Sequence, residues 1–168
     1  MKKQKGFSLI ELLIVVAIIL IIAAIAIPNL LKSKMAANES GAAGTIRTIN
    51  TGEATFSTMC PQIGYSAALM DLAPTGATCK SGAGIVDAIL GGATGTKEGY
   101  IFTEAGGNPV GGANTTFTDQ AAPQTPATSG IRIFCSSQTN VIYFDPAGTK
   151  CTPDGAAGTG GGPNVLGQ

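Results

Sequence analysis

Residues 12–27 read LLIVVAIILIIAAIAI, a run of sixteen residues without one polar side chain. Extending the run back to Phe7 adds only Ser8 and Glu11 as polar members. As an α-helix, residues 7–27 would span roughly 31 Å at about 1.5 Å per residue, close to the hydrocarbon thickness of a bilayer. A strand of this length would lie far outside the normal range. The run therefore predicts a helix surrounded by lipid or by other helices.

The residues on either side of this run indicate its orientation in a membrane and whether it remains in the mature protein. The six residues before it, MKKQKG, carry three lysines. A short positive flank predicts that the N-terminus stays in the cytoplasm and that the rest of the chain is translocated. After the run stands PNLLK rather than a small-x-small cleavage site. We therefore expect the apolar segment to remain in the mature protein.

The composition excludes several classes of function. Ten Lys and Arg residues balance ten Asp and Glu residues, and the chain has no histidine. A balanced charge offers no basic face for nucleic acid, so no specific nucleic-acid site is evident. Without histidine, the usual general base and the commonest zinc ligand are both missing. We expect no enzymatic activity, no catalytic residue, no metal site and no cofactor.

The helical period continues beyond Pro28. One apolar stripe comprises Met35, Ala42, Ile46, Ile49, Phe56 and Met59. The opposite, polar face comprises Asn38, Glu39, Arg47, Asn50 and Glu53. This pattern predicts one continuous helix from residue 7 to about residue 58, apolar all round in its first half and amphipathic in its second. Pro28 and the glycines at positions 41, 44 and 52 weaken that helix.

After Met59 the apolar runs become short and β-like. Strands are expected at residues 100–103, 131–135 and 141–144, with a further one at 115–118. The strands expected at 131–135 and 141–144 are separated by a loop whose length suits a hairpin. Residues 85–90 favour a helical turn or two. Residues 106–114 and 119–130 are expected to be surface loops.

The segment KGFSLIELLIVV at residues 5–16, followed by residues 24–28, resembles the class III leader and N-terminal helix of type IV pilins and related pseudopilins. The resemblance implies an α+β type IV pilin fold, in which a long N-terminal helix packs on a small antiparallel sheet. It also implies that a prepilin peptidase cuts after Gly6 and methylates the new amino group of Phe7. Which filament system the chain serves is left open.

Glu11 has a physical argument of its own. An ionisable group within an apolar helix is expensive in lipid and is functional by default. Near the helix start, however, a carboxylate is also favoured by the positive end of the helix dipole. The resemblance implies that in a filament Glu11 pairs with the Phe7 amine of a neighbouring subunit. It also marks Pro28 as a helix break, where the helix unwinds as subunits pack; simple curvature is the other interpretation.

Four cysteines follow the helix, namely Cys60, Cys79, Cys135 and Cys151. An even number in an exported, glycine-rich head indicates two disulfides, for which three connectivities exist. We favour Cys60–Cys79 and Cys135–Cys151 because each closes a local loop. The second also resembles the C-terminal disulfide loop of pilins. Zinc and redox sites are less well matched, because no close C-x-x-C pair is present.

The resulting organisation has five parts. They are a leader peptide at 1–6, a hydrophobic transmembrane or filament-core helix at 7–31, its amphipathic continuation at 32–59, a globular sheet head at 60–151, and a Gly-rich tail at 152–168.

The resemblance implies a structural subunit, the major pilin of a type IV pilus, that supports adhesion, twitching motility or DNA uptake. Its partners would be other copies of itself, the prepilin peptidase, the assembly machinery and the inner membrane. It would cross that membrane once before assembly and lie in a surface pilus afterwards. The alternatives are a type II secretion pseudopilin or minor pilin, and a membrane-anchored surface-binding module.

Overall fold

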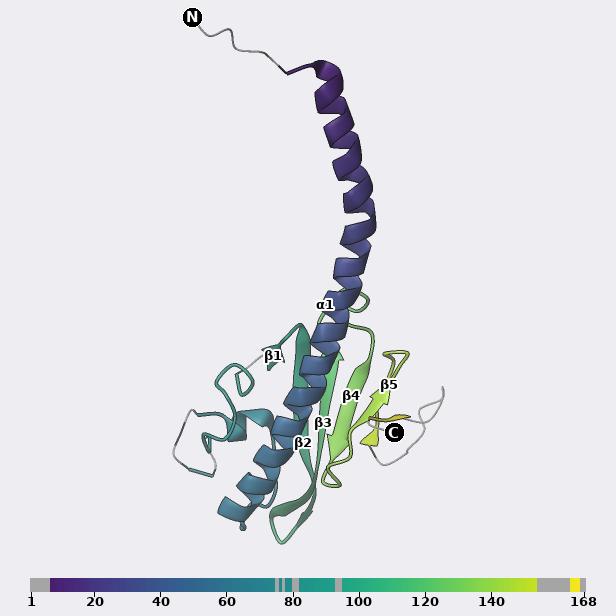
Figure 1. Ribbon diagram of the computed structural model, residues 1–168. Coiled ribbons are helices and arrows are strands. Elements are labelled where there is room, and N and C mark those ends of the chain that lie inside the picture. Colours follow the sequence, from purple (N-terminus) through teal and green to yellow (C-terminus); the bar gives the residue numbers. More distant parts are fainter. Residues whose placement is uncertain are drawn as a thin grey trace, which may run out of the picture. The chain divides into compact units, whose positions relative to one another are not determined.

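The computed structural model describes residues 7–74, 76, 78–79, 82–92, 95–153 and 164–166. The chain forms two compact units, Met1–Lys34 and Met35–Gln168. The elements, shown in Figure 1, are helix α1 (Leu9–Met59), the 3-10 helix η1 (Leu69–Leu72) and strands β1 (Thr96–Lys97), β2 (Tyr100–Val110), β3 (Ala113–Pro123), β4 (Ile133–Ser137), β5 (Tyr143–Asp145) and β6 (Asn164–Val165). The expected α+β fold, a long N-terminal helix and an antiparallel sheet, is confirmed.

In the first unit, α1 consists almost entirely of Leu, Ile, Val and Ala. A helix satisfies its backbone hydrogen bonds internally, which is the requirement for a segment in lipid. Pro28 lies inside α1, and the helix continues on both sides of it. The proline removes one backbone hydrogen-bond donor and destabilises a helix interior by about 3 kcal/mol, yet α1 remains continuous. Unwinding at Pro28 in packed subunits stays a prediction.

The second unit contains one six-stranded antiparallel sheet in the order β1-β2-β3-β4-β5-β6. Strands β2 and β3 form a long hairpin whose register pairs Tyr100 with Pro123 and Val110 with Ala113. The hairpin between β4 and β5, which the sequence predicts, is present. In Figure 1 the part of α1 that belongs to this unit lies across one face of the sheet. Each strand therefore presents alternate residues to the helix.

The core of the second unit lies between α1 and the sheet. From α1 it contains four fully buried residues of the predicted stripe: Ala42, Ile46, Ile49 and Phe56. From the sheet it contains Tyr100, Phe102, Ala121 and Phe134. The ring of Phe134 lies 6.1 Å from that of Tyr100 and 6.5 Å from that of Phe144. Each buried aromatic side chain contributes roughly 1.5–3 kcal/mol.

The predicted surface loops at 106–114 and 119–130 are largely wrong. Residues 106–110 continue β2, and residues 119–123 continue β3. The turn between them is Gly111–Gly112, both with positive φ, as a tight hairpin requires. Glycine is also needed within β2, because a Cβ on Gly106 would lie 2.4 Å from the carbonyl oxygen of Ser66. A glycine-rich composition here serves close packing of backbones rather than a loop.

The predicted polar face of α1 is partly wrong. Asn50 and Glu53 are buried, whereas Met59, assigned to the apolar stripe, is 58% exposed. Both side chains accept bonds inside the second unit: the Ser136 hydroxyl of β4 donates to Asn50 Oδ1 at 2.6 Å, and the N–H of Ser66 donates to Glu53 Oε2 at 3.0 Å. The segment after α1 also packs against the helix, because a Cβ on Gly52 would lie 3.2 Å from the Ile85 side chain. Glu53 follows Ile49 by four positions and precedes Phe56 by three, so helical spacing places it on the apolar stripe rather than opposite it.

Three smaller expectations concern residues 85–90, the start of β4 and the tail. Within residues 85–90 there is one short turn, in which the N–H of Gly91 donates to the Asp87 carbonyl at 3.1 Å and the Asp87 carboxylate caps the N–H groups of Ile89 and Leu90. Residues 131–132 lie before β4 rather than in it. In the tail, Asn164 and Val165 pair with β5 as strand β6. Residues 154–163 and 167–168 lie outside the described residues.

Candidate functional site

The start of α1 positions Glu11. Ser8 precedes the helix, and its carbonyl accepts the first helical bond from the N–H of Leu12 at 3.2 Å. The Glu11 carboxylate in turn accepts a bond from the N–H of Ser8 at 3.5 Å. This is the glutamate half of a capping box, in which Ser and Glu are three residues apart. The sequence reasoning above missed this role, although the S-x-x-E spacing before an apolar run signals it.

Glu11 is the only acidic residue within a long exposed apolar surface. Every large apolar side chain described from Phe7 to Leu31 is exposed, for example Phe7 at 81% and Leu30 at 70%. An apolar surface of this extent marks contact with lipid or with other protein. Helix α1 is long and apolar enough to cross a membrane by length and composition. The segment can therefore exist in a bilayer or in a bundle of like helices.

Both residues of the predicted assembly pair, Phe7 and Glu11, are described in the structure. Phe7 and Glu11 lie on the same chain, where the carboxylate bonds the backbone of Ser8. The contact between Glu11 and the Phe7 amine of a second copy therefore stays a prediction. Gly6 and the rest of the predicted leader, residues 1–6, lie outside the described residues.

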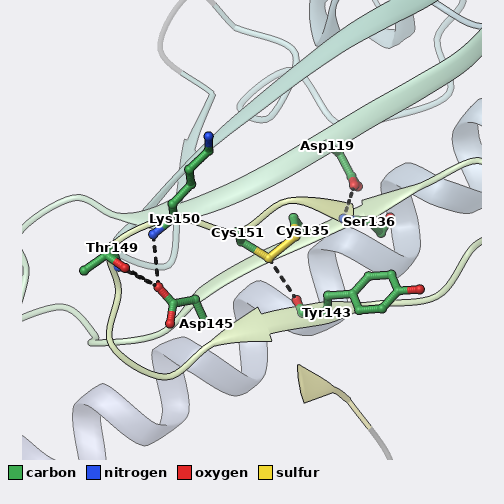
Figure 2. Close-up of a disulfide and its surroundings, with 8 residues drawn as sticks. All are labelled: Asp119, Cys135, Ser136, Tyr143, Asp145, Thr149, Lys150 and Cys151. Carbon is green, nitrogen blue, oxygen red and sulfur yellow. Dashed lines mark hydrogen bonds between the residues drawn. A yellow bond between two sulfur atoms is a disulfide. The ribbon is translucent and has the colours of Figure 1, made fainter. Parts of the chain in front are cut away.

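Both cysteine pairs form disulfides in the second unit. Cys60 directly follows α1 and bonds Cys79, and Cys135 of β4 bonds Cys151. These are the pairings favoured above. The first disulfide ties the end of the helix to the segment that folds back along it. The second ties β4 to the chain that leaves β5, as Figure 2 shows.

Beside the second disulfide, the Asp145 carboxylate organises the loop that leads to Cys151. It accepts bonds from the N–H groups of Ala147 at 3.0 Å, Thr149 at 2.7 Å and Lys150 at 3.0 Å, and from the Thr149 hydroxyl at 2.8 Å. Figure 2 shows the Thr149 and Lys150 contacts. These donors, with the Lys150 N–H first, hold the pKa of Asp145 well below its usual value.

We expect Asp145→Ala to lower the free energy of unfolding by about 2 kcal/mol, the range for hydrogen bonds to a charged group. Because the folded pKa lies below the ordinary value of 3.8, this stabilisation is complete above about pH 4 and is lost as the pH falls below it. Thermal unfolding from pH 2.5 to 7 measures the difference. Glu98→Gln, which changes an exposed carboxylate, is the control. Equal acid sensitivity of Asp145→Ala and the wild type would contradict this role.

Other chemistry has little support in the described part of the chain. Among those residues, no group of three or more Cys, Asp or Glu side chains could hold a metal ion. All four cysteines are in disulfides, so none is a free thiol. The arrangement can therefore insert in lipid, pack with other helices and present a cross-linked head.

Each comparison with known proteins covers less than a third of the chain. The family described as the prokaryotic N-terminal methylation motif matches residues 1–27. Over 40 residues, 24% of this chain, it is 60% identical to the type IV wide pilus major component PilA4 of Thermus thermophilus, of which the match covers 30%. Over 54 residues, 32% of this chain, it is 46% identical to the type IV major pilin protein PilA of Myxococcus xanthus, of which the match covers 24%. No solved structure matches the chain significantly.

Proposed function

We propose that this chain, which has the N-terminal segment of a type IV prepilin, is the major structural subunit of a type IV pilus filament. The observation that carries the proposal is the exposed apolar part of α1, with Glu11 near its start. Exposing an apolar surface of this extent to water is unfavourable. It fits a segment that is stored in lipid and then packed among like helices.

Assembly begins with processing in this proposal. The prepilin peptidase removes residues 1–6, cutting after Gly6, and methylates the amino group of Phe7. Phe7 then starts a helix that crosses the inner membrane once, with its N-terminus on the cytoplasmic side. Glu11 lies close to that end, where the positive helix terminus and the polar headgroup region lower the energetic cost of its charge.

Filament growth then depends on helix packing. Lipid is as apolar as the helices, so association gains little from hydrophobicity and needs specific contacts. The Glu11 carboxylate supplies one, to the Phe7 amine of the subunit already in place. The charge of each group is compensated by the other as both leave the membrane interface. The sheet heads then coat the bundle, and the two disulfides stabilise them outside the cell.

The partners follow from this mechanism. They are further copies of the chain, the prepilin peptidase, and the inner-membrane machinery that extracts the subunit from lipid. The finished filament would serve adhesion, twitching motility or DNA uptake at the cell surface. These roles, and the machinery, rest on the family resemblance of the N-terminal segment.

Deletion of the gene in its host tests the proposal against its alternatives. We expect the deletion to remove long surface filaments, seen by electron microscopy, and complementation to restore them. Secretion of exported enzymes should be unchanged. Unchanged filaments combined with lost secretion would instead identify a secretion pseudopilin. Unchanged filaments and secretion, with the chain found only as a membrane monomer, would favour the anchored binding module.

A further inference from the structure

Three carboxyl groups come together in the core of the second unit. Glu53 comes from α1, Glu104 from β2 and Asp119 from β3. Glu53 is completely buried, and Asp119 is 1% exposed. Glu104 and Asp119 are directly opposite each other in the β2–β3 register, so both point to the helix face of the sheet. Burial of charged groups at such positions is unusual unless they are paired or neutral.

Each carboxyl has one oxygen that accepts a hydrogen bond. The N–H of Ser66 donates to Glu53 Oε2 at 3.0 Å, and the hydroxyl of Ser66 donates to Glu104 Oε1. The N–H of Ser136 donates to Asp119 Oδ1 at 2.8 Å. Ser66 thus bridges the glutamate of the helix and the glutamate of the sheet.

The second oxygen of each carboxyl is buried without a partner: Glu53 Oε1, Glu104 Oε2 and Asp119 Oδ2. Because the N–H of Ser66 binds Glu53 and its hydroxyl binds Glu104, the two glutamate side chains lie next to each other. A carboxylate offers no donor, so two ionised groups would leave both oxygens unsatisfied and would repel each other. A single proton between them satisfies both atoms at once.

No cation compensates this cluster among the described residues. The ion pairs in that part of the chain are Lys97–Asp87 and Arg132–Glu39, and neither involves the three carboxyls. The arrangement is therefore unlike a buried salt bridge. Neutralisation by a proton lowers the energetic cost of burying these carboxyl groups.

We propose that Glu53 and Glu104 share one proton in a carboxyl–carboxylate hydrogen bond, which joins α1 to β2 and makes the helix–sheet contact sensitive to pH. One of the two groups is the acid and donates, and the other is the carboxylate and accepts. The pair carries a single negative charge, and Ser66 donates to both members. Loss of the proton leaves two adjacent buried charges and loosens the contact.

The protonation of the pair is consistent with its surroundings. Burial, together with the hydrogen bond to Glu53 and its charge, raises the pKa of Glu104 to about 10. Burial raises the pKa of Asp119 to about 6, against the hydrogen bonds that Ser136 donates. The segment that carries Ser66 also contains the titratable residues Tyr65 and Asp71, and β4 contributes the neutral Ser136 to the cluster.

The direction of the pH dependence follows from linkage. The folded chain keeps a proton that the unfolded chain releases near the ordinary glutamate value of 4.5. Stability is therefore complete below that pH and declines as the pH rises towards the folded value. One retained proton lowers the folding equilibrium constant by up to about tenfold per pH unit in this window. Asp119 adds to the slope below about pH 6.

The experiment uses the full chain in detergent micelles. Infrared difference spectroscopy at pH 7.5 detects the carbonyl stretch of a buried protonated carboxyl. Thermal unfolding followed by near-ultraviolet circular dichroism from pH 5 to 9 measures the stability profile. The variants are Glu104→Gln and Glu53→Gln, each of which supplies a neutral amide donor to the remaining carboxylate. Glu98→Gln, which alters an exposed glutamate in the turn before β2, is the matched control.

We expect the wild type and Glu98→Gln to show the protonated band at pH 7.5 and to lose thermal stability as the pH rises. Glu104→Gln should lack that band and have a flatter profile, with a higher melting temperature than the wild type at pH 9. Absence of the band in the wild type would overturn the proposal, and this outcome needs no variant to fold. A wild-type pH slope retained in both Glu104→Gln and Glu53→Gln would overturn it as well.

Discussion

Replacing Glu11 by valine is expected to leave the chain in the membrane and to remove filaments from the cell surface. Valine adds to an already apolar segment, so insertion should be unimpaired. In a filament, however, the Phe7 amine would be buried without its partner. Breaking a buried pair in this way costs about 3 kcal/mol or more, roughly a hundredfold in each subunit contact. The measurement is the ratio of sheared surface protein to membrane protein by immunoblot.

Two further variants separate charge from helix formation. Glu11→Gln keeps an acceptor for the N–H of Ser8 and so preserves the capping interaction, but it removes the charge. We expect it to assemble as poorly as Glu11→Val. Lys32→Gln removes a charge near the other end of the apolar segment and should assemble normally. Wild-type filament yield in Glu11→Gln would contradict the charge pairing and would leave only a capping role.

Removing the Cys135–Cys151 disulfide is the second change with a large expected effect. The two residues are 16 positions apart, and a loop of this size corresponds to about 3 kcal/mol of unfolding free energy. Serine at both positions should therefore lower the melting temperature markedly. It should also accelerate amide exchange between Asp145 and Cys151, where the loop in Figure 2 is fixed at both ends.

The Cys60–Cys79 pair provides the matched control, because its separation of 19 predicts a similar global loss. Its local effect should lie in a different place, at the end of α1, with the loop after Asp145 unchanged. Hydrogen exchange followed by mass spectrometry distinguishes the two patterns. If both double-serine variants have wild-type melting temperatures, the disulfides do not stabilise the head.

Sequence patterns are reliable in this chain where a single physical requirement dominates. A run without polar side chains must be a helix if it is to lie in lipid, and α1 extends through it. Likewise Ala42, Ile46 and Ile49 recur on one face of a helix, and all three are fully buried. The strand that starts at Tyr100 is also predicted, from the short β-like run at residues 100–103, and Tyr100 and Phe102 are buried in it.

The errors arise where a second contact decides the outcome. Glu53 is predicted on the polar face because of its charge, although its spacing from Ile49 and Phe56 places it on the stripe, where it is completely buried. The Gly106 segment was assigned to a loop, since glycine usually weakens a strand. Here its missing side chain admits the backbone of Ser66. The contacts with Ser66 that accommodate both residues are long-range, and the local pattern of residues does not encode them.

The most direct measurement on the central claim is the intact mass and N-terminal sequence of protein sheared from the surface of cells that express this chain. A filament subunit should begin at Phe7 with one added methyl group and should lack four hydrogen atoms because of its two disulfides. A chain that retains residues 1–6 and occurs only in the membrane fraction would contradict the assignment as a pilus subunit.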